Sequence, residues 1–304
     1  MSPDHSSARG GLMAILGSVC WGLSGSMGQF LFTHEGMDSR WLVPIRLFGA
    51  GVILLLYSLL RYGPSMTVRP WTTVRDAVDL LIYGLLGVSA CQFFYFLTIQ
   101  LSSAGTATIL QDLSPIMVLL VLCIQEKRPP NGREVLSIAM ALIGVLLITT
   151  HGDFSSLSVS FRVFFTGLLC AVCVTVYTVY PGRLLSVFPV PLLQGWSFLL
   201  GGSAFFLLFH PWTYGYVPTP IGYFGIAFVI LVGNVLAFVL FMTGVHLAGP
   251  EKSNLYSFAE PLTAALVSTV FLGSPFTLSD FIGFLLVFGM LLLLARQPRR
   301  EVQP

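Results

Sequence analysis

Long hydrophobic stretches, separated by short polar segments, run along nearly the whole chain. A stretch of about 20 hydrophobic residues can cross a hydrocarbon core of roughly 30 Å as an α-helix. Stretches such as 140–148 and 285–294 do not alternate between polar and apolar residues, as the strands of a membrane barrel do. The pattern predicts an all-α integral membrane protein with ten transmembrane helices, at residues 11–32, 41–61, 78–98, 104–124, 133–150, 164–184, 190–209, 222–246, 252–272 and 279–295.

The second half of the chain repeats part of the first half. Residues 83–147 and 229–293 align without a gap at an offset of 146 residues. The matched pairs include Leu85 and Leu231, Gly87 and Gly233, Leu101 and Leu247, and Pro115 and Pro261. Duplicated halves of this kind are typical of membrane transporters.

Lys and Arg residues collect on one side of the predicted membrane, and in membrane proteins that side is the cytoplasm. With the amino terminus inside, the inner segments hold twelve: Arg9, Arg61, Arg69, Arg75, Lys127, Arg128, Arg133, Arg183, Lys252, Arg296, Arg299 and Arg300. Only Arg40 and Arg162 fall in outer segments, and Arg46 within a helix completes the 15. We therefore expect both termini in the cytoplasm. Because five helices per half is an odd number, the repeat is predicted to be a 5+5 inverted-topology repeat.

Composition supports a membrane protein and excludes several other classes. Hydrophobic residues make up 55% and charged residues 9%, with a mean hydropathy of +0.86, whereas soluble domains are roughly 25% charged. The net charge of +2 reflects the basic inner segments and indicates no nucleic-acid partner. All five cysteines fall within predicted helices, and Cys170 and Cys173 are spaced for packing rather than for a metal or redox site. The sequence predicts no metal and no cofactor, and it holds no nucleotide-binding motif of an ATP-driven pump.

Three ionisable residues lie within predicted helices, where charge is costly and usually faces a pathway or a partner. They are Arg46, Asp112 and Glu260. Glu260 lies eight residues beyond the inner end of its helix, or about 12 Å deep at 1.5 Å per residue. These three form the candidate coupling or ion-pair set. Structural roles stay open: Glu260 protonated or paired with Arg46, Arg46 snorkelling to the headgroups, and Asp112 accepting hydrogen bonds from neighbouring helices.

Each of the two acids is followed by a proline, Pro115 or Pro261, at matched positions of the two halves. A proline inside a helix removes one backbone hydrogen bond and clashes with the carbonyl four residues earlier. Those carbonyls belong to Gln111 and Ser257. We therefore expect one kinked helix in each half, with a freed carbonyl oxygen that faces a cavity.

Other polar and aromatic residues at depth complete a candidate substrate cavity. Trp21 and Tyr177 each lie ten residues after a Gly-Leu pair at the start of the first helix of their half, where they could form opposing walls. The amides could bind a substrate or bridge helices. The full candidate set is Trp21, Gln92, Gln111, Asp112, Tyr177, Asn234, Asn254 and Glu260.

The two proline-containing segments carry a family resemblance. The run "SSAGTATILQDLSPIMVLLVL" from residue 102 and the run "SNLYSFAEPLTAALVSTVFLG" from residue 253 both resemble the EamA-type domain of the drug/metabolite transporter superfamily. Arg46 and the pair Trp21-Gly22 also resemble the pattern of that family. The resemblance implies a cytoplasmic tail at 1–10, a first EamA-type repeat at 11–150, an outer linker at 151–163, a second repeat at 164–295 and a cytoplasmic tail at 296–304.

The resemblance also implies a function in the bacterial inner membrane. Members of this superfamily are secondary transporters, often exporters, of small metabolites such as amino acids, with a cavity lined by helices 1, 3, 4, 6, 8 and 9. We expect a small-molecule substrate and the lipid bilayer as partners. Protons as coupling ion, exchange without coupling, and homodimer formation all stay open. The alternatives are a structural or assembly subunit and a membrane-embedded enzyme, although no histidine has an acidic or histidine partner at metal-ligand spacing.

Overall fold

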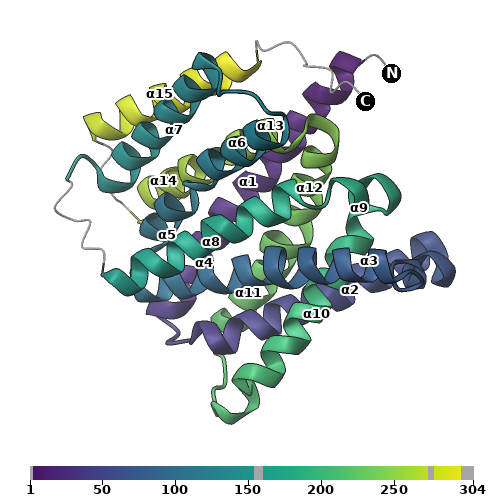
Figure 1. The fold of residues 1–304 in the computed structure, drawn as a ribbon. Helices are drawn as coiled ribbons and strands as arrows, with labels where there is room; N and C mark the ends of the chain where they lie inside the picture. Colours follow the sequence, from purple (N-terminus) through teal and green to yellow (C-terminus); the bar gives the residue numbers. More distant parts are fainter. Residues whose placement is uncertain (1–2, 154–159, 273–276, 296–304) are drawn as a thin grey trace.

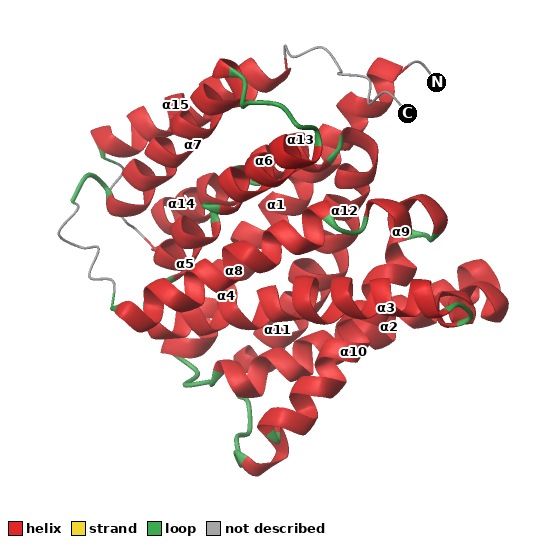
Figure 2. Cartoon of the chain, viewed as in Figure 1, coloured by secondary structure: helices red, strands yellow, loops and turns green. Residues whose placement is uncertain are grey.

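The computed structural model describes residues 3–153, 160–272 and 277–295, all of them in helices or in the loops between helices (Figures 1 and 2). The predicted carboxyl-terminal tail and the middle of the predicted outer linker lie outside the described residues. The helices are α1 (Pro3–Thr33), α2 (Ser39–Val68), α3 (Val74–Leu81), α4 (Ala90–Leu101), α5 (Ala104–Gln111), α6 (Ser114–Gln125), α7 (Gly132–Thr150), α8 (Phe161–Val179), α9 (Gly182–Val187), α10 (Val190–Phe209), α11 (Pro220–Phe228), α12 (Ala237–Ala248), α13 (Pro250–Tyr256), α14 (Ala259–Leu272) and α15 (Leu278–Ala295).

Eight continuous helical segments in the described part of the chain are long and apolar enough to cross a membrane. They lie at the first eight predicted positions, from Ala8–Thr33 to Pro220–Ala248. The predicted segment 252–272 corresponds to α13 and α14 together, and 279–295 corresponds to α15, whose apolar stretch Leu278–Met290 is shorter. The structure therefore confirms an all-helical, membrane-spanning architecture within the described residues.

Both proline-containing helices are broken rather than only kinked. In the first half the break separates α5 from α6 just before Pro115, and in the second half it separates α13 from α14 just before Pro261. The expectation of a freed carbonyl at Ser257 is wrong, because that oxygen accepts the Glu260 backbone N–H at 2.8 Å. A tighter turn thus replaces the hydrogen bond that the proline removes.

Two further segments have the wider turns of a π-helix: η2 (Ile82–Ser89) joins α3 to α4, and η5 (Val229–Leu236) joins α11 to α12. Their first residues, 82 and 229, are 147 positions apart, which differs by one residue from the 146-residue offset of the sequence repeat. Such π-helical turns often occur at functional sites. Each one lies next to a polar residue of the candidate cavity, Gln92 after η2 and Asn234 within η5.

Small residues allow the long helices to pack closely. A Cβ atom on Gly51 of α2 would lie 2.5 Å from the backbone nitrogen of Leu199, and one on Gly202 of α10 would lie 2.5 Å from that of Phe48. Only glycine fits both sides of this crossing, so α2 and α10 are held backbone to backbone. At the other side of the bundle, α7 and α15 lie side by side as an outer pair (Figure 1).

The buried hydrophobic residues form two clusters. The larger cluster is built from α1, α2, α4, α8, α10 and α12 and includes Phe198, Phe238 and Phe241. The smaller one joins α6, α7, α13 and α15 around Phe258 and Val287. The broken helices contribute to these clusters themselves, since α5 supplies Ala104 and Ala107 to the larger one and α6, α13 and α14 supply residues to the smaller one.

Candidate functional site

A small internal cavity lies where helices of both halves meet. Its volume of about 20 Å³ leaves room for roughly one water molecule. Its walls carry both aromatic and polar side chains. The lining residues are Trp21, Ser24, Gly25, Arg46, Cys91, Gln92, Tyr95, Phe96, Gln111, Tyr177, Phe238 and Glu260.

Arg46 of α2 forms one side of this cavity and is only 1% exposed. Its Nε donates to Oδ1 of Asn234 at 2.8 Å, and its Nη2 donates to the same oxygen and to Oε1 of Gln92, the latter at 3.0 Å. The guanidinium carbon lies 3.7 Å from the centre of the Phe96 ring, within the range of a cation–π interaction. Arg46 is thus held between α2, α4 and η5 and does not reach the headgroups.

The charge of Arg46 has no acidic partner among the described residues. No ion pair of the described residues includes Arg46. Its Nη1 and the neighbouring Nδ2 of Asn234 have no hydrogen-bond partner among the described residues. Buried charges in proteins are normally paired, because an unpaired one carries a large desolvation cost. This arrangement therefore carries a cost in stability.

Glu260 of α14 lies on the same cavity and is 2% exposed. Its Oε1 accepts the Tyr95 hydroxyl at 2.7 Å, and its Oε2 accepts the amide of Gln111 at 3.4 Å. Tyr95 comes close because Gly25 lacks a side chain: a Cβ there would lie 2.9 Å from the Tyr95 hydroxyl. The carboxyl group of the second half is thus held by two neutral residues of the first half, and Arg46 is not among its contacts.

The two predicted aromatic walls also line the cavity. Trp21 donates its indole N–H to the carbonyl of Gly233 at 3.1 Å and packs edge-on against Phe238, with 4.8 Å between the ring centres. Tyr177, from the second half of the chain, packs on the same Phe238, with 5.9 Å between the ring centres. Both rings therefore contact one shared residue of α12.

The structure separates two of the predicted residues from the cavity. Asp112 is buried at the break between α5 and α6, and its Oδ2 has no hydrogen-bond partner among the described residues. The side-chain amide nitrogen of Asn254, on α13, donates to the hydroxyl of Ser114 at 3.5 Å. Neither residue lines the cavity. Asn234 adjoins it through Arg46 instead.

Sequence reasoning missed Tyr95 and Phe96, which contact the two buried charged groups directly. Helical spacing offers one signal for Tyr95. It follows Gln92 by three residues on α4, so both side chains share a helix face. No comparable signal marks Phe96, because the chain has 25 phenylalanines and most of them pack in the core or against lipid.

Comparison with known proteins identifies the family. Two ranges of the chain, 8–150 and 162–296, match the EamA-like transporter family. The chain belongs to the EamA-like transporter family. YicL of Salmonella typhimurium, described as an uncharacterized inner membrane transporter, is 32% identical over 298 residues, which cover 98% of this chain and 99% of YicL.

More distant relatives agree with this assignment. YyaM of Bacillus subtilis, described as an uncharacterized transporter, is 25% identical over 221 residues, or 70% of this chain and 71% of that protein. A solved crystal structure superposes with a TM-score of 0.74 at 18% identity and covers 96% of both chains, which establishes a shared fold. The EamA-like chain is therefore a multi-pass protein of the inner membrane, in a family of transporters rather than of enzymes.

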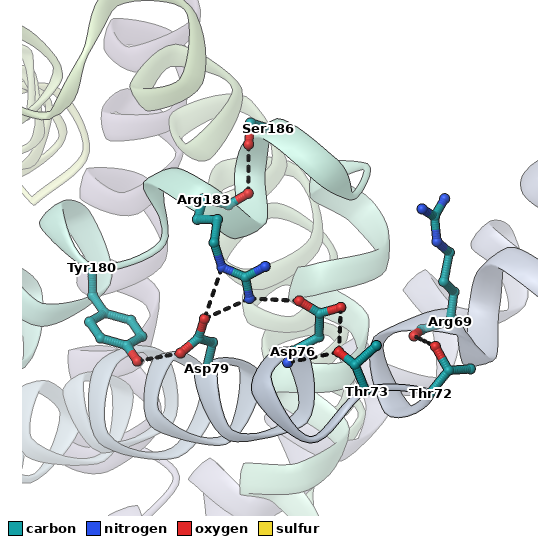
Figure 3. A network of polar contacts seen from close by, with 8 residues as sticks. All are labelled: Arg69, Thr72, Thr73, Asp76, Asp79, Tyr180, Arg183 and Ser186. Carbon is teal, nitrogen blue, oxygen red and sulfur yellow. Dashed lines mark hydrogen bonds and ion pairs between the residues drawn. The ribbon is translucent and has the colours of Figure 1, made fainter. Parts of the chain in front are cut away.

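A second polar site of this EamA-like protein lies at the start of α3, outside the central cavity (Figure 3). Arg183 of α9 contacts Asp76 and Asp79 of α3 with its Nη2, at 2.6 Å each. The Tyr180 hydroxyl donates to Asp79 at 2.7 Å, and Thr73 donates to Asp76 at 2.8 Å while capping α3. We call Asp76, Asp79, Tyr180 and Arg183 the α3–α9 network. It fastens the first half of the chain to the second.

Proposed function

We propose that this protein is a secondary transporter that moves a small polar metabolite, such as an amino acid, across the inner membrane by alternating access, as an exporter or exchanger. The proposal rests on the cavity, which is lined by a buried cation of one half and a buried acid of the other half. Buried ionisable groups at membrane depth usually mark a substrate or ion pathway.

The proposal includes the inverted repeat of five plus five helices, with both termini in the cytoplasm. The breaks at α5–α6 and α13–α14, and the π-helical segments η2 and η5, occur at matched places in the two halves. In transporters with inverted repeats, discontinuous helices at the repeat interface form the substrate site. In Figure 1 the start of α1 and the end of α15 both lie toward the same edge of the molecule, which supports termini on one side of the membrane.

Contacts between the halves explain how access could alternate. The central hydrogen bonds of Arg46 to Asn234 and of Tyr95 to Glu260 both cross from one half to the other. The α3–α9 network does the same on the side assigned to the cytoplasm. On the opposite side, Thr219 before α11 donates to Glu35 at 2.8 Å. Release of one set of contacts while the other is kept opens the cavity to one side only.

The two buried acids are the candidates for coupling. Glu260 faces the cavity, and Asp112 follows Gln111, whose amide donates to Glu260. A proton taken up by Glu260 would change the hydrogen bonds that it accepts from Tyr95 and Gln111, so protonation and the contact between the halves are linked. Exchange without protons uses the same contacts, with a second substrate molecule in the place of the proton.

Transport and substrate binding can be tested on the purified protein. The measurement is thermal stabilisation across a panel of amino acids, amines, nucleosides and sugars, followed by counterflow of the hits in proteoliposomes. We expect at least one hit to be transported, and we expect Glu260→Gln to weaken its binding and slow its flux. Glu126→Gln is the matched control, since this glutamate is exposed near the end of α6 and lies away from the cavity.

Two outcomes would argue against the proposal. Silence across the whole panel together with no flux favours a structural or assembly subunit. A hit whose binding and flux are the same in Glu260→Gln and in Glu126→Gln removes Glu260 from the substrate site and from coupling.

A further inference from the structure

The surroundings of Arg46 contain several hydrogen-bond donors, and no acidic side chain of the described residues forms an ion pair with it. Nη1 of Arg46, Nδ2 of Asn234 and the hydroxyl of Ser24 are buried and have no hydrogen-bond partner among the described residues. Arg46 and Ser24 line the cavity, and Asn234 is bonded to Arg46. A buried donor without an acceptor costs roughly 1–3 kcal/mol, and more for a charged group. Three such donors in one place are therefore unlike the rest of a packed core.

The orientation of the Asn234 amide follows from chemistry. A guanidinium group can only donate hydrogen bonds, so the atom of Asn234 that faces it must be the carbonyl oxygen. That oxygen accepts from both Nε and Nη2 of Arg46. The NH₂ group of Asn234 then has no acceptor among the described residues, and exchanging its O and N atoms would set two donors against each other. The unmet donor of Asn234 thus follows from the residue types and not from the choice of amide orientation.

A carboxylate can satisfy these donors and supply the missing charge at the same time. A carboxylate offers two oxygens and about four acceptor sites in a plane that matches the guanidinium fork. It also supplies the negative charge that no described residue supplies to Arg46. Trp21, Phe96 and Phe238 line the same cavity and offer aromatic surface for a carbon skeleton. Glu260 on the same cavity disfavours a second negative charge.

We infer that the transported substrate is a small compound with a single carboxylate, which Arg46 and Asn234 bind in the cavity between the halves. The inference rests on the proposed transport function and names the chemical class of its substrate. The bound carboxylate fills the space beside Arg46. It thereby turns an unpaired buried cation into a hydrogen-bonded ion pair. Compounds in which the carboxylate is replaced by an amide, or lost altogether, bind more weakly because they leave the charge of the guanidinium uncompensated.

The first experiment compares matched compounds on the wild-type protein. L-leucine and L-phenylalanine are each tested beside their carboxamides and their decarboxylated amines, with acetate and inorganic phosphate as minimal anions. Thermal stabilisation and counterflow in proteoliposomes are the readouts. We expect the carboxylate of each series to bind about 10- to 100-fold more tightly than its carboxamide, as loss of a charge-assisted hydrogen bond predicts. Phosphate reports whether a tetrahedral anion is accepted in place of a carboxylate.

The decisive variant is Asn234→Asp, because it places a carboxylate of the protein itself beside Arg46 with almost no change in shape. We expect this variant to fold with a midpoint of thermal unfolding at least equal to that of the wild type, and to lose the preference for carboxylates over carboxamides. Arg46→Gln is expected to lose the same preference, and Arg46→Lys to keep part of it, since lysine retains the charge without the planar fork. Gln29→Glu, outside the cavity lining, is the control for an added acid.

The outcomes separate this inference from the proposed function. Carboxylate binding that persists unchanged in Asn234→Asp and in Arg46→Gln overturns the inference. So does a wild-type protein that transports an amine, a sugar or phosphate but no carboxylate, and in that case the transport function stands. Absence of binding and flux for every compound removes the transport function itself and this inference with it.

Discussion

Two arginines of this protein are surrounded in opposite ways. Arg183, in the α3–α9 network, has a side chain that is 35% exposed, and it contacts two aspartates. Arg46 is 1% exposed, and it contacts two amide oxygens and one aromatic ring. The solvated cation thus has two counter-charges, while the buried cation has none in the part of the chain that the structure describes. Stability alone would favour counter-charges beside the buried cation, because water screens a surface charge and cannot screen a buried one.

The difference indicates different uses for the two sites. The α3–α9 network has its acceptors filled, so it can only hold α3 and α9 together or release them. Arg46 keeps an N–H group without a partner in the described part of the chain, and so does Asn234 beside it. A donor kept free at a cost in stability is available to a ligand. The two sites therefore correspond to a fastening between the halves and a binding site between the halves.

The largest effect is expected when the buried site loses its main acceptor. Asn234→Leu removes the oxygen that accepts twice from Arg46, and we expect the free energy of unfolding to fall by about 2–4 kcal/mol. Replacing both residues, as in Arg46→Met with Asn234→Leu, removes the stranded charge as well and should recover a large part of that loss. The measurement is reversible unfolding in mixed micelles, analysed as a double-mutant cycle.

Gln92→Leu is the control for this cycle, since Gln92 accepts only one hydrogen bond from Arg46. Additive losses in the double variant would mean that Arg46 and Asn234 do not depend on one another, and the contrast between the two arginines would lose its energetic basis.

Much of the fold could be predicted from the sequence, because lipid imposes simple demands. A charge-poor helix of about 20 residues is visible as composition alone, and the eight continuous spans lie at the positions where the hydrophobic stretches do. The breaks before Pro115 and Pro261 follow from proline chemistry. The π-helical turns η2 and η5 could not be predicted. They lie inside mostly apolar runs, where too few polar positions alternate with apolar ones to reveal how many residues each turn contains.

The site was only partly predictable, for a related reason. Burial cost marks Arg46 and Glu260 as exceptional in any apolar helix, and the structure places both on the cavity. Which groups they contact depends on how the helices cross. The sequence suggested that Glu260 could pair with Arg46, whereas Tyr95, Gln111 and Asn234 provide the actual hydrogen bonds. Aromatic and amide residues are too common in this chain for pattern alone to select those partners.

One chemical change applied to both sites measures their difference directly. Tyr95 and Tyr180 each donate a hydroxyl to an acidic side chain at 2.7 Å, Tyr95 at the cavity and Tyr180 in the α3–α9 network. Tyr95→Phe removes a hydrogen-bond donor from the buried carboxyl group of Glu260. We expect this change to lower the free energy of unfolding by about 1–3 kcal/mol. Tyr180→Phe leaves Asp79 in reach of water, and its cost should stay below about 0.5 kcal/mol. Equal losses would show that burial does not set the value of these hydrogen bonds.

The smallest effect is expected at Arg183, and salt is the variable that reveals it. Arg183→Gln removes both ion pairs of the α3–α9 network, yet we expect the midpoint of thermal unfolding to fall by no more than about 2 °C, because exposed pairs contribute little. Raising the salt concentration from about 0.05 M to about 1 M shortens the screening length several-fold, so the gap between this variant and the wild type should close. Arg162→Gln, at an exposed arginine near the start of α8, corrects for the change in net charge. A gap that stays constant in salt would place Arg183 among the buried, structural cations and would remove the contrast with Arg46.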